Sequence, residues 1–196
     1  MKKHASLLLF FFILFSFCAC SEIKQIKEPA YKANGDYSGF SDIPDNYTPQ
    51  KAKEDGCFVI VSADENDTKS KVYGKNQWQS FFESSNKGKD SFLRVAHFIG
   101  KEGYYSDLFY HENKYYQYTK DEYGIRLMGS YKYLRALAGE DGMPRKQVTL
   151  YVLTDSMDLT CNDVLWSFYS SNHETITKIP FVWLGFTTYL NKADEN

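Results

Sequence analysis

The chain has 196 residues and a formal net charge of −2, from 23 basic and 25 acidic side chains. Proteins that bind nucleic acid usually carry clustered lysine and arginine, so this balance argues against a nucleic-acid partner. The length suits one domain with a sizeable hydrophobic core.

The first twenty residues have the pattern of a bacterial export signal. Lys2 and Lys3 precede an apolar stretch over residues 5–17, which is shorter than the ~20 residues of a membrane-spanning helix. The small Ala19 comes directly before Cys20, as at sites where a lipoprotein peptidase cuts before a lipid-modified cysteine. We therefore expect residues 1–19 to be a lipoprotein signal peptide and Cys20 to be lipidated. The alternative is a plain secretory signal, cleaved near Ala19, that leaves Cys20 unmodified.

Lipidation would also decide where the protein resides. Two or more acyl chains anchor a protein stably to a membrane, whereas one chain does not. We expect a protein of the cell envelope, held to a membrane on its extracytoplasmic side. Processing removes two basic residues and no acidic one, so the mature charge is 21 − 25 = −4.

Residues 20–46 are rich in charged residues, glycine and proline, with few clustered apolar residues. Such a composition buries too little surface to offset the entropy of ordering, which predicts a flexible tether. We expect one globular domain over residues 47–190 and a frayed tail over residues 191–196.

The periodicity of apolar residues predicts both helices and strands within the domain. Thr48 and Pro49 are typical of a helix start, and Gly56 of a helix end. Residues 124–138 fit either a strand or a helix, and their alternation favours a strand. The predicted helices cover residues 50–55, 76–86 and 160–171, the last with Val164, Leu165, Phe168 and Tyr169 facing inward. The predicted strands cover residues 57–63, 92–99, 104–110, 115–120, 124–138, 147–154 and 181–190.

The fold class that follows is α+β. We expect a mainly antiparallel sheet of about five to seven strands, with two or three helices packed on one face. The clearest part is a meander of three strands over residues 92–120, because turn residues separate its apolar runs.

The meander and the residues after it concentrate tyrosine, with nine of the chain's 16 between residues 104 and 133. Tyrosine offers apolar area and a hydroxyl at low entropic cost, so Tyr105, Tyr116 and Tyr118 form a candidate binding surface for an envelope protein or a glycan. The alternative is that these rings only pair across strands, which aromatic residues favour.

Two cysteines remain after processing, Cys57 and Cys161. They form a candidate disulfide in an oxidising compartment, or two buried thiols. Cys161 could also serve as a nucleophile with a histidine base, but His97, His111 and His173 are widely spaced. The acidic loop that begins at Asp64 lacks the glycine and glutamate of an EF-hand, so we expect no metal site. No nucleotide or cofactor motif is present, and we expect no cofactor.

Several short motifs follow one another between residues 47 and 154. They are Tyr47-Thr48-Pro49, Gly56 before an apolar strand, Val72-Tyr73-Gly74, Trp78 with Phe81, and Gly88-Lys89 before Leu93-Arg94-Val95. The chain resembles the small bacterial lipoproteins grouped as the domain of unknown function 4362. The resemblance implies export, anchoring and an α+β domain, and it carries over no catalytic residue.

We therefore expect an exported, lipid-anchored envelope protein that acts as a non-enzymatic binding or interaction module. The alternative is a surface-anchored hydrolase acting on a cell-wall component or a peptide. That alternative needs Cys161 or an acidic pair within hydrogen-bond reach of a histidine.

Overall fold

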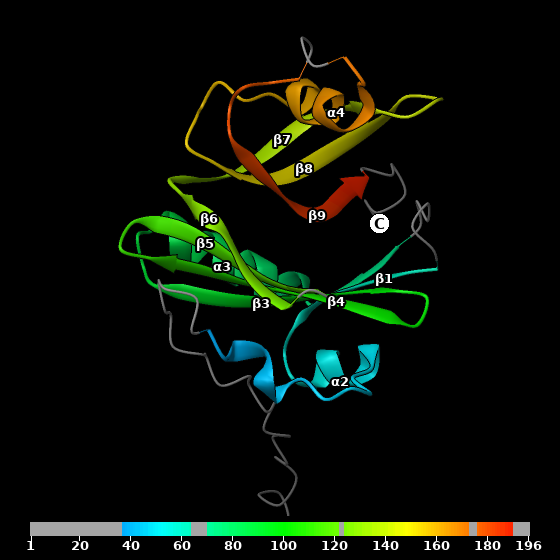
Figure 1. Ribbon diagram of the computed structural model, residues 1–196, viewed down its shortest axis with the longest axis vertical. Helices are drawn as coiled ribbons and strands as arrows, with labels where there is room; N and C mark the ends of the chain where they lie inside the picture. Colours follow the sequence, from blue (N-terminus) through cyan, green and yellow to red (C-terminus); the bar gives the residue numbers. More distant parts are fainter. Residues whose placement is uncertain (1–36, 64–69, 122–123, 173–175, 190–196) are drawn as a thin grey trace, which may run out of the picture.

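The computed structural model describes residues 37–63, 70–121, 124–172 and 176–189. These residues form a six-stranded sheet, a three-stranded sheet and three α-helices, which confirms the α+β class (Figure 1). The predicted signal peptide, Cys20, the tether up to residue 36, the acidic loop over residues 64–69 and the tail over residues 191–196 lie outside the described residues.

The six-stranded sheet has the strand order β2-β1-β3-β4-β5-β6. Strands β1 and β3 run parallel, and every other neighbouring pair is antiparallel. The predicted meander is confirmed as β3 to β5; Glu112 and Asn113 form its second turn with φ of 50° and 60°, as two-residue hairpin turns require. The strands are β1 (Phe58–Ser62), β2 (Lys71–Tyr73), β3 (Ser91–Ile99), β4 (Glu102–His111), β5 (Lys114–Asp121) and β6 (Gly124–Tyr131).

The three-stranded sheet consists of β7 (Tyr133–Asp141), β8 (Lys146–Thr154) and β9 (Phe181–Tyr189). The stretch 124–138, predicted as one strand, is divided between the two sheets because the chain turns at Lys132. The backbone N–H of Lys132 donates to Asp155 Oδ1 at 2.8 Å, outside both ladders. Alternation of side chains continues on both sides of this turn, so the pattern alone does not reveal it.

The helices lie on three different faces, whereas the sequence predicted one common face. Helix α2 (Pro49–Glu54) is capped by Thr48, α3 (Lys75–Asn86) follows Gly74 at φ 77°, and α4 (Cys161–Tyr169) starts with a capping box between Thr160 and Asp163. Helices α2 and α3 pack on opposite faces of the six-stranded sheet, and α4 packs on the three-stranded sheet.

We call the face of the six-stranded sheet that carries α3 the inner face. Its apolar side chains share one buried cluster with α3 and with the three-stranded sheet, through residues such as Phe81, Leu134, Leu153 and Leu184. The two sheets therefore stack on each other (Figure 1). The opposite face of the six-stranded sheet is called the outer face.

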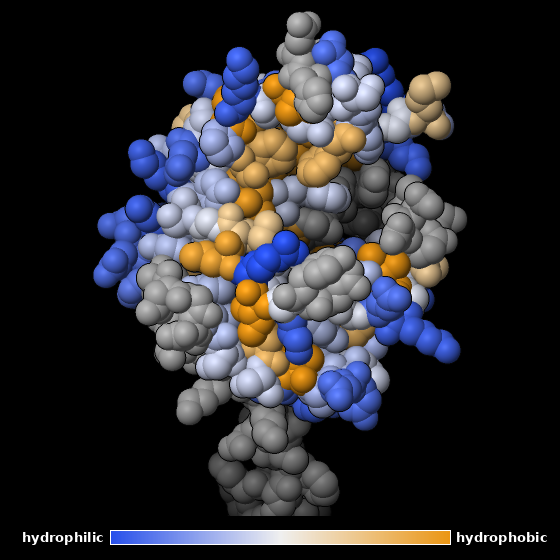
Figure 2. All heavy atoms as spheres, viewed as in Figure 1, coloured by the Kyte–Doolittle hydropathy of each residue, from blue (hydrophilic) through white to orange (hydrophobic). Residues whose placement is uncertain are grey.

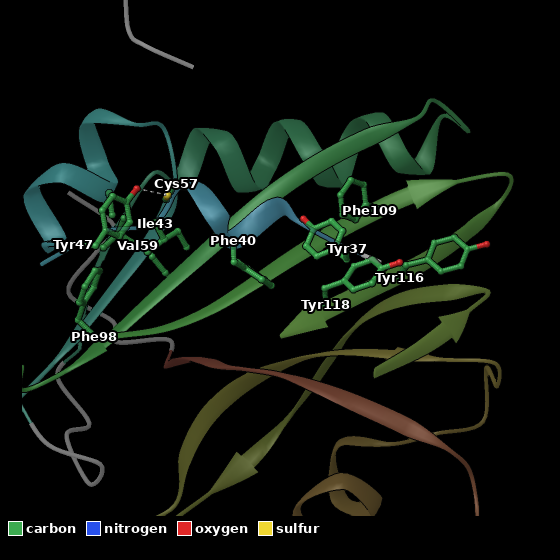
Figure 3. Close-up of a cluster of buried hydrophobic side chains, with 12 residues drawn as sticks. Tyr37, Phe40, Ile43, Tyr47, Cys57, Val59, Phe98, Phe109, Tyr116 and Tyr118 are labelled. Carbon is green, nitrogen blue, oxygen red and sulfur yellow. Dashed lines mark hydrogen bonds between the residues drawn. The ribbon is translucent and has the colours of Figure 1, made fainter. Parts of the chain in front are cut away.

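The outer face is covered by residues 37–47, which we call the strap. Tyr37, Phe40 and Ile43 are 4%, 1% and 9% exposed and belong to one buried cluster with the sheet, in which Tyr37 lies beside Tyr118 and Ile43 lies near Cys57 (Figure 3). The prediction that the tether extends to residue 46 is therefore wrong for its last ten residues. A few apolar residues are enough to order this segment, because each one is buried against the apolar surface of the sheet.

A buried ion pair fixes the strap to the sheet. Arg94 on β3 and Asp107 on β4 are 2% and 0% exposed, and their bidentate contact joins Nε to Oδ1 at 2.7 Å and Nη2 to Oδ2 at 2.8 Å. Arg94 also donates to Asp42 Oδ1 at 2.8 Å and to the Gly39 carbonyl, and the Tyr37 hydroxyl donates to Asp107.

Burial opposes both charges of this pair. It raises the pKa of Asp107, while the hydrogen bonds and charge of Arg94 act in the other direction. Burial alone would lower the pKa of Arg94, but the hydrogen bonds and charges of Asp107 and Asp42 outweigh burial and raise it. Each partner thus remains ionised only because the other is present.

Replacing Arg94 tests this arrangement. We expect Arg94→Met to lower the free energy of unfolding by about 3–5 kcal/mol, because Asp107 is left without its buried partner. The control is Arg145→Met, since the Arg145 side chain is 80% exposed and pairs with Glu140 at the surface; it should cost less than about 1 kcal/mol. Urea unfolding measures both, and equal losses in the two variants would contradict the account.

Candidate functional site

The tyrosines predicted to form a binding surface do not form one. Tyr118 is 0% and Tyr116 is 9% exposed, and the half-buried Tyr105 packs against the same cluster. The ring of Tyr37 stacks on Tyr118 with centroids 4.0 Å apart, so the strap covers the surface (Figure 3). The prediction of an exposed surface at these rings is therefore wrong for the described structure, because they pack in the buried cluster under the strap.

Of the two alternatives for the cysteines, the structure shows two buried thiols and not the candidate disulfide. Cys57 and Cys161 are both free and buried. Cys57 lies in the outer-face cluster and Cys161 in the cluster beneath α4, and these clusters flank the core that separates them. A disulfide requires the two Cα atoms within about 7 Å of each other, which this placement excludes.

The burial of both thiols predicts low reactivity. Burial raises the pKa of Cys57 to about 11 and also raises the pKa of Cys161, so few thiolates form near pH 8. We expect a thiol-specific aryl disulfide to label neither cysteine in the folded chain, and both after unfolding in urea. A chain purified without reductant whose mass is lower by two hydrogens would show the disulfide and contradict the structure.

A row of polar side chains lies on the inner face, where the strand register brings five residues together. Val95 pairs with Ser106 and His97 pairs with Tyr104 between β3 and β4, and Leu108 pairs with Gln117 between β4 and β5. Ser62, the last residue of β1, lies on the same face. We call these residues the polar row: Ser62, His97, Tyr104, Ser106 and Gln117.

Hydrogen bonds connect the row into two groups. His97 Nε2 and Ser62 Oγ are 3.0 Å apart, and Ser62 Oγ lies 2.7 Å from Ser70 Oγ. Gln117 Nε2 donates to Ser106 Oγ at 3.2 Å. Gln117 is 3% exposed, and its Oε1 has no hydrogen-bond partner among the described residues.

Gln117 and Ser62, at the two ends of the row, are buried; His97 and Ser106 are half-buried, and Tyr104 between the ends is 42% exposed. Ser62 and His97 lie near the ends of the parallel strands β1 and β3, whereas Ser106 is level with Val95 in the middle of β3, and Gln117 is level with Leu93 near its start. The row could not be predicted from the sequence, because its polar residues share the inward positions of the same strands with apolar ones such as Ile99 and Leu108.

Burial lowers the pKa of His97, so the imidazole is neutral near pH 7. A histidine with a lowered pKa in the folded state binds protons more readily once the chain unfolds. Its contribution to stability is therefore complete above its ordinary pKa of about 6.5 and is lost as the pH falls below that value. The ring is suited to accept a proton or a hydrogen bond at neutral pH.

Proton NMR of the His97 ring tests this assignment. We expect its titration midpoint below about 6.5, the ordinary histidine value. His97→Asn, which loses the ring signal, identifies the resonance. A midpoint at or above the ordinary value would contradict the buried, neutral imidazole.

The hydrolase alternative requires a nucleophile or an acidic residue beside a histidine, and the structure brings only some of the candidates together. Cys161 lies among aliphatic side chains, and its cluster contains no histidine among the described residues. His111 Nδ1 lies 2.7 Å from Asp90 Oδ2, but both side chains are well exposed near a strand end. Ser62 with His97 is the nearest match to a nucleophile and its base. The part of the chain that the structure describes has no cluster suited to a metal ion.

Apolar residues are exposed in two further places. Ile125, Leu127 and Met128 on the edge strand β6 are 40%, 39% and 41% exposed, and Figure 2 shows hydrophobic residues along the path of this strand. On α4, Phe168 and Tyr169 are 55% and 68% exposed, so the prediction that they face inward is wrong. Helix α4 buries Val164, while Phe168 lies over β9 against Trp183 at a centroid distance of 5.4 Å.

Comparison with known proteins finds no matching family model, no matching curated protein and no matching solved structure. The resemblance to the domain of unknown function 4362 remains a prediction. Across the described ranges, no helix has the length and apolar character needed to cross a membrane.

Proposed function

We propose that this chain is an exported, lipid-anchored envelope protein whose folded domain is a non-enzymatic binding module, with the polar row as its ligand site. The export pattern before Cys20 supports the location. The observation that supports the binding role is the row itself: a set of neutral polar side chains that extends from a buried amide to a half-exposed tyrosine ring.

The position of the strap suits a tethered protein. The strap and α2 lie at one end of the molecule, and α4 with the three-stranded sheet lies at the other (Figure 1). A chain anchored at Cys20 would thus be tied at the strap end, and the polar row, on the opposite face of the sheet from the strap, would stay clear of the anchored face.

A second candidate function is the surface-anchored hydrolase, which the Ser62–His97 contact at 3.0 Å favours. Ser62 Oγ would attack an acyl carbon while its proton passes to His97 Nε2. His97 would give that proton to the departing alcohol or amine as the acyl bond breaks, and water would then release the acyl group from Ser62 as an acid. We prefer the binding role because Ser62 is 5% exposed and its oxygen is shared with Ser70.

The anchor is tested by the intact mass of the membrane-extracted protein, compared with a Cys20→Ala variant. We expect a chain that begins at Cys20 and carries added acyl mass, because the thiol and the new amino terminus are the acylated groups. The variant should lose membrane association. An unmodified chain released to the medium would contradict the anchor and leave the fold and the polar row unaffected.

A further inference from the structure

We infer that the polar row binds a neutral, hydroxyl-rich sugar, so that the ligand of the proposed binding module is a glycan. The inference rests on the proposed function for the site, and it adds the chemical class of the ligand. Three features of the row support it: its spacing, its uncharged side chains beside a single carboxylate neighbour, and its unsatisfied amide.

The spacing suits a sugar ring. Side chains that face each other across neighbouring strands stand about 4.8 Å apart, close to the width of one pyranose ring. His97 and Tyr104 form one such pair, and Ser106 on β4 lies two residues along from Tyr104 on the same face. The partly exposed Tyr104 ring offers an apolar surface to the C–H groups of a sugar, beside groups that bind its hydroxyls.

The groups of the row carry no full charge. They are hydroxyls, one amide and the imidazole of His97, which is neutral because burial lowers its pKa. Arg126 shares the face two strands from Ser106, but it is exposed and has an interaction of its own. The Tyr104 hydroxyl donates to the Glu102 carboxylate at 2.9 Å, so this neighbour repels an anionic ligand at the row, whereas the hydroxyls of a neutral polyol can donate to it.

The side-chain amide of Gln117 offers an unsatisfied hydrogen-bond acceptor that a ligand could satisfy. A buried carbonyl oxygen without a hydrogen bond destabilises the structure, and Gln117 Oε1 is such an atom among the described residues. Its amide nitrogen is already directed to Ser106, which fixes the oxygen. A sugar hydroxyl that reaches this oxygen, directly or through one ordered water, would satisfy it.

The experiment uses the processed chain, residues 20–196 with Cys20→Ala, so that its outcome does not depend on the anchor. Amide NMR spectra are recorded with four neutral trisaccharides, namely chitotriose, cellotriose, maltotriose and mannotriose, and with an anionic one, trigalacturonate. We expect saturable shifts on β3, β4 and β5 near the row with at least one neutral sugar, and none with the anionic one.

Two variants locate the site. Tyr104→Ala should raise the dissociation constant about tenfold, since a stacked aromatic ring contributes about that factor to affinity. Tyr133→Ala, a matched tyrosine that is 39% exposed on the other sheet, should leave it unchanged. His97→Asn keeps a polar side chain of similar reach and should also weaken binding.

Each remaining outcome overturns the inference. No shift with any neutral sugar at millimolar concentration rules out the glycan, and shifts with trigalacturonate alone rule out neutrality. Shifts that Tyr133→Ala abolishes and Tyr104→Ala does not would place the site elsewhere. A recovered chitotriose that has lost acetyl groups would identify the hydrolase instead, and the mass test of the anchor would remain valid in every case.

Discussion

The Arg94–Asp107 pair is the interaction on which the rest of the structure depends. It lies at the centre of the six-stranded sheet with almost no exposure, so neither charge is tolerable without the other. The same guanidinium binds the Gly39 carbonyl and Asp42, and the same carboxylate accepts from Tyr37. One pair of charges thus selects the strap from all other segments that could cover the sheet. Burial of apolar side chains would favour covering this face with any apolar segment, because the hydrophobic effect is not directional. The ion pair and its hydrogen bonds favour residues 37–47 in particular.

Fixing the strap gives the two faces of the sheet different roles. The outer face is sealed, since Phe40 and Tyr118 are almost completely buried there. On the inner face, the apolar side chains pack against α3 and the three-stranded sheet, and the polar row lies on the same strands, with Gln117 beside Leu108 of that core and Tyr104 exposed. The proposed ligand site lies on the inner face, where Tyr104 is exposed. The tyrosines that suggested a binding surface are instead the lining under the strap.

Sequence reasoning predicted the elements better than their assembly. The β3–β5 meander follows from local alternation and turn residues, and the start of α2 follows from Thr48 and Pro49. The strap escaped prediction because Tyr37, Phe40 and Ile43 are single apolar residues among polar ones, and the strands that they cover are distant in sequence. The polar row escaped for a related reason: His97 and Gln117 belong to different strands, and only the register places them on one face. Local patterns give the period of each strand, whereas register and covering segments depend on contacts distant in sequence.

Hydroxyl-radical footprinting with mass spectrometry, on the folded chain, tests most directly whether one face is sealed and the other accessible. The structure predicts rapid modification of Tyr104, which is 42% exposed, and strong protection of Tyr116 and Tyr118 until the chain unfolds. Modification of Tyr116 and Tyr118 at the rate of Tyr104 would show that the strap does not cover the outer face. That result would contradict a sealed outer face, and Tyr105, Tyr116 and Tyr118 would again be the candidate binding surface.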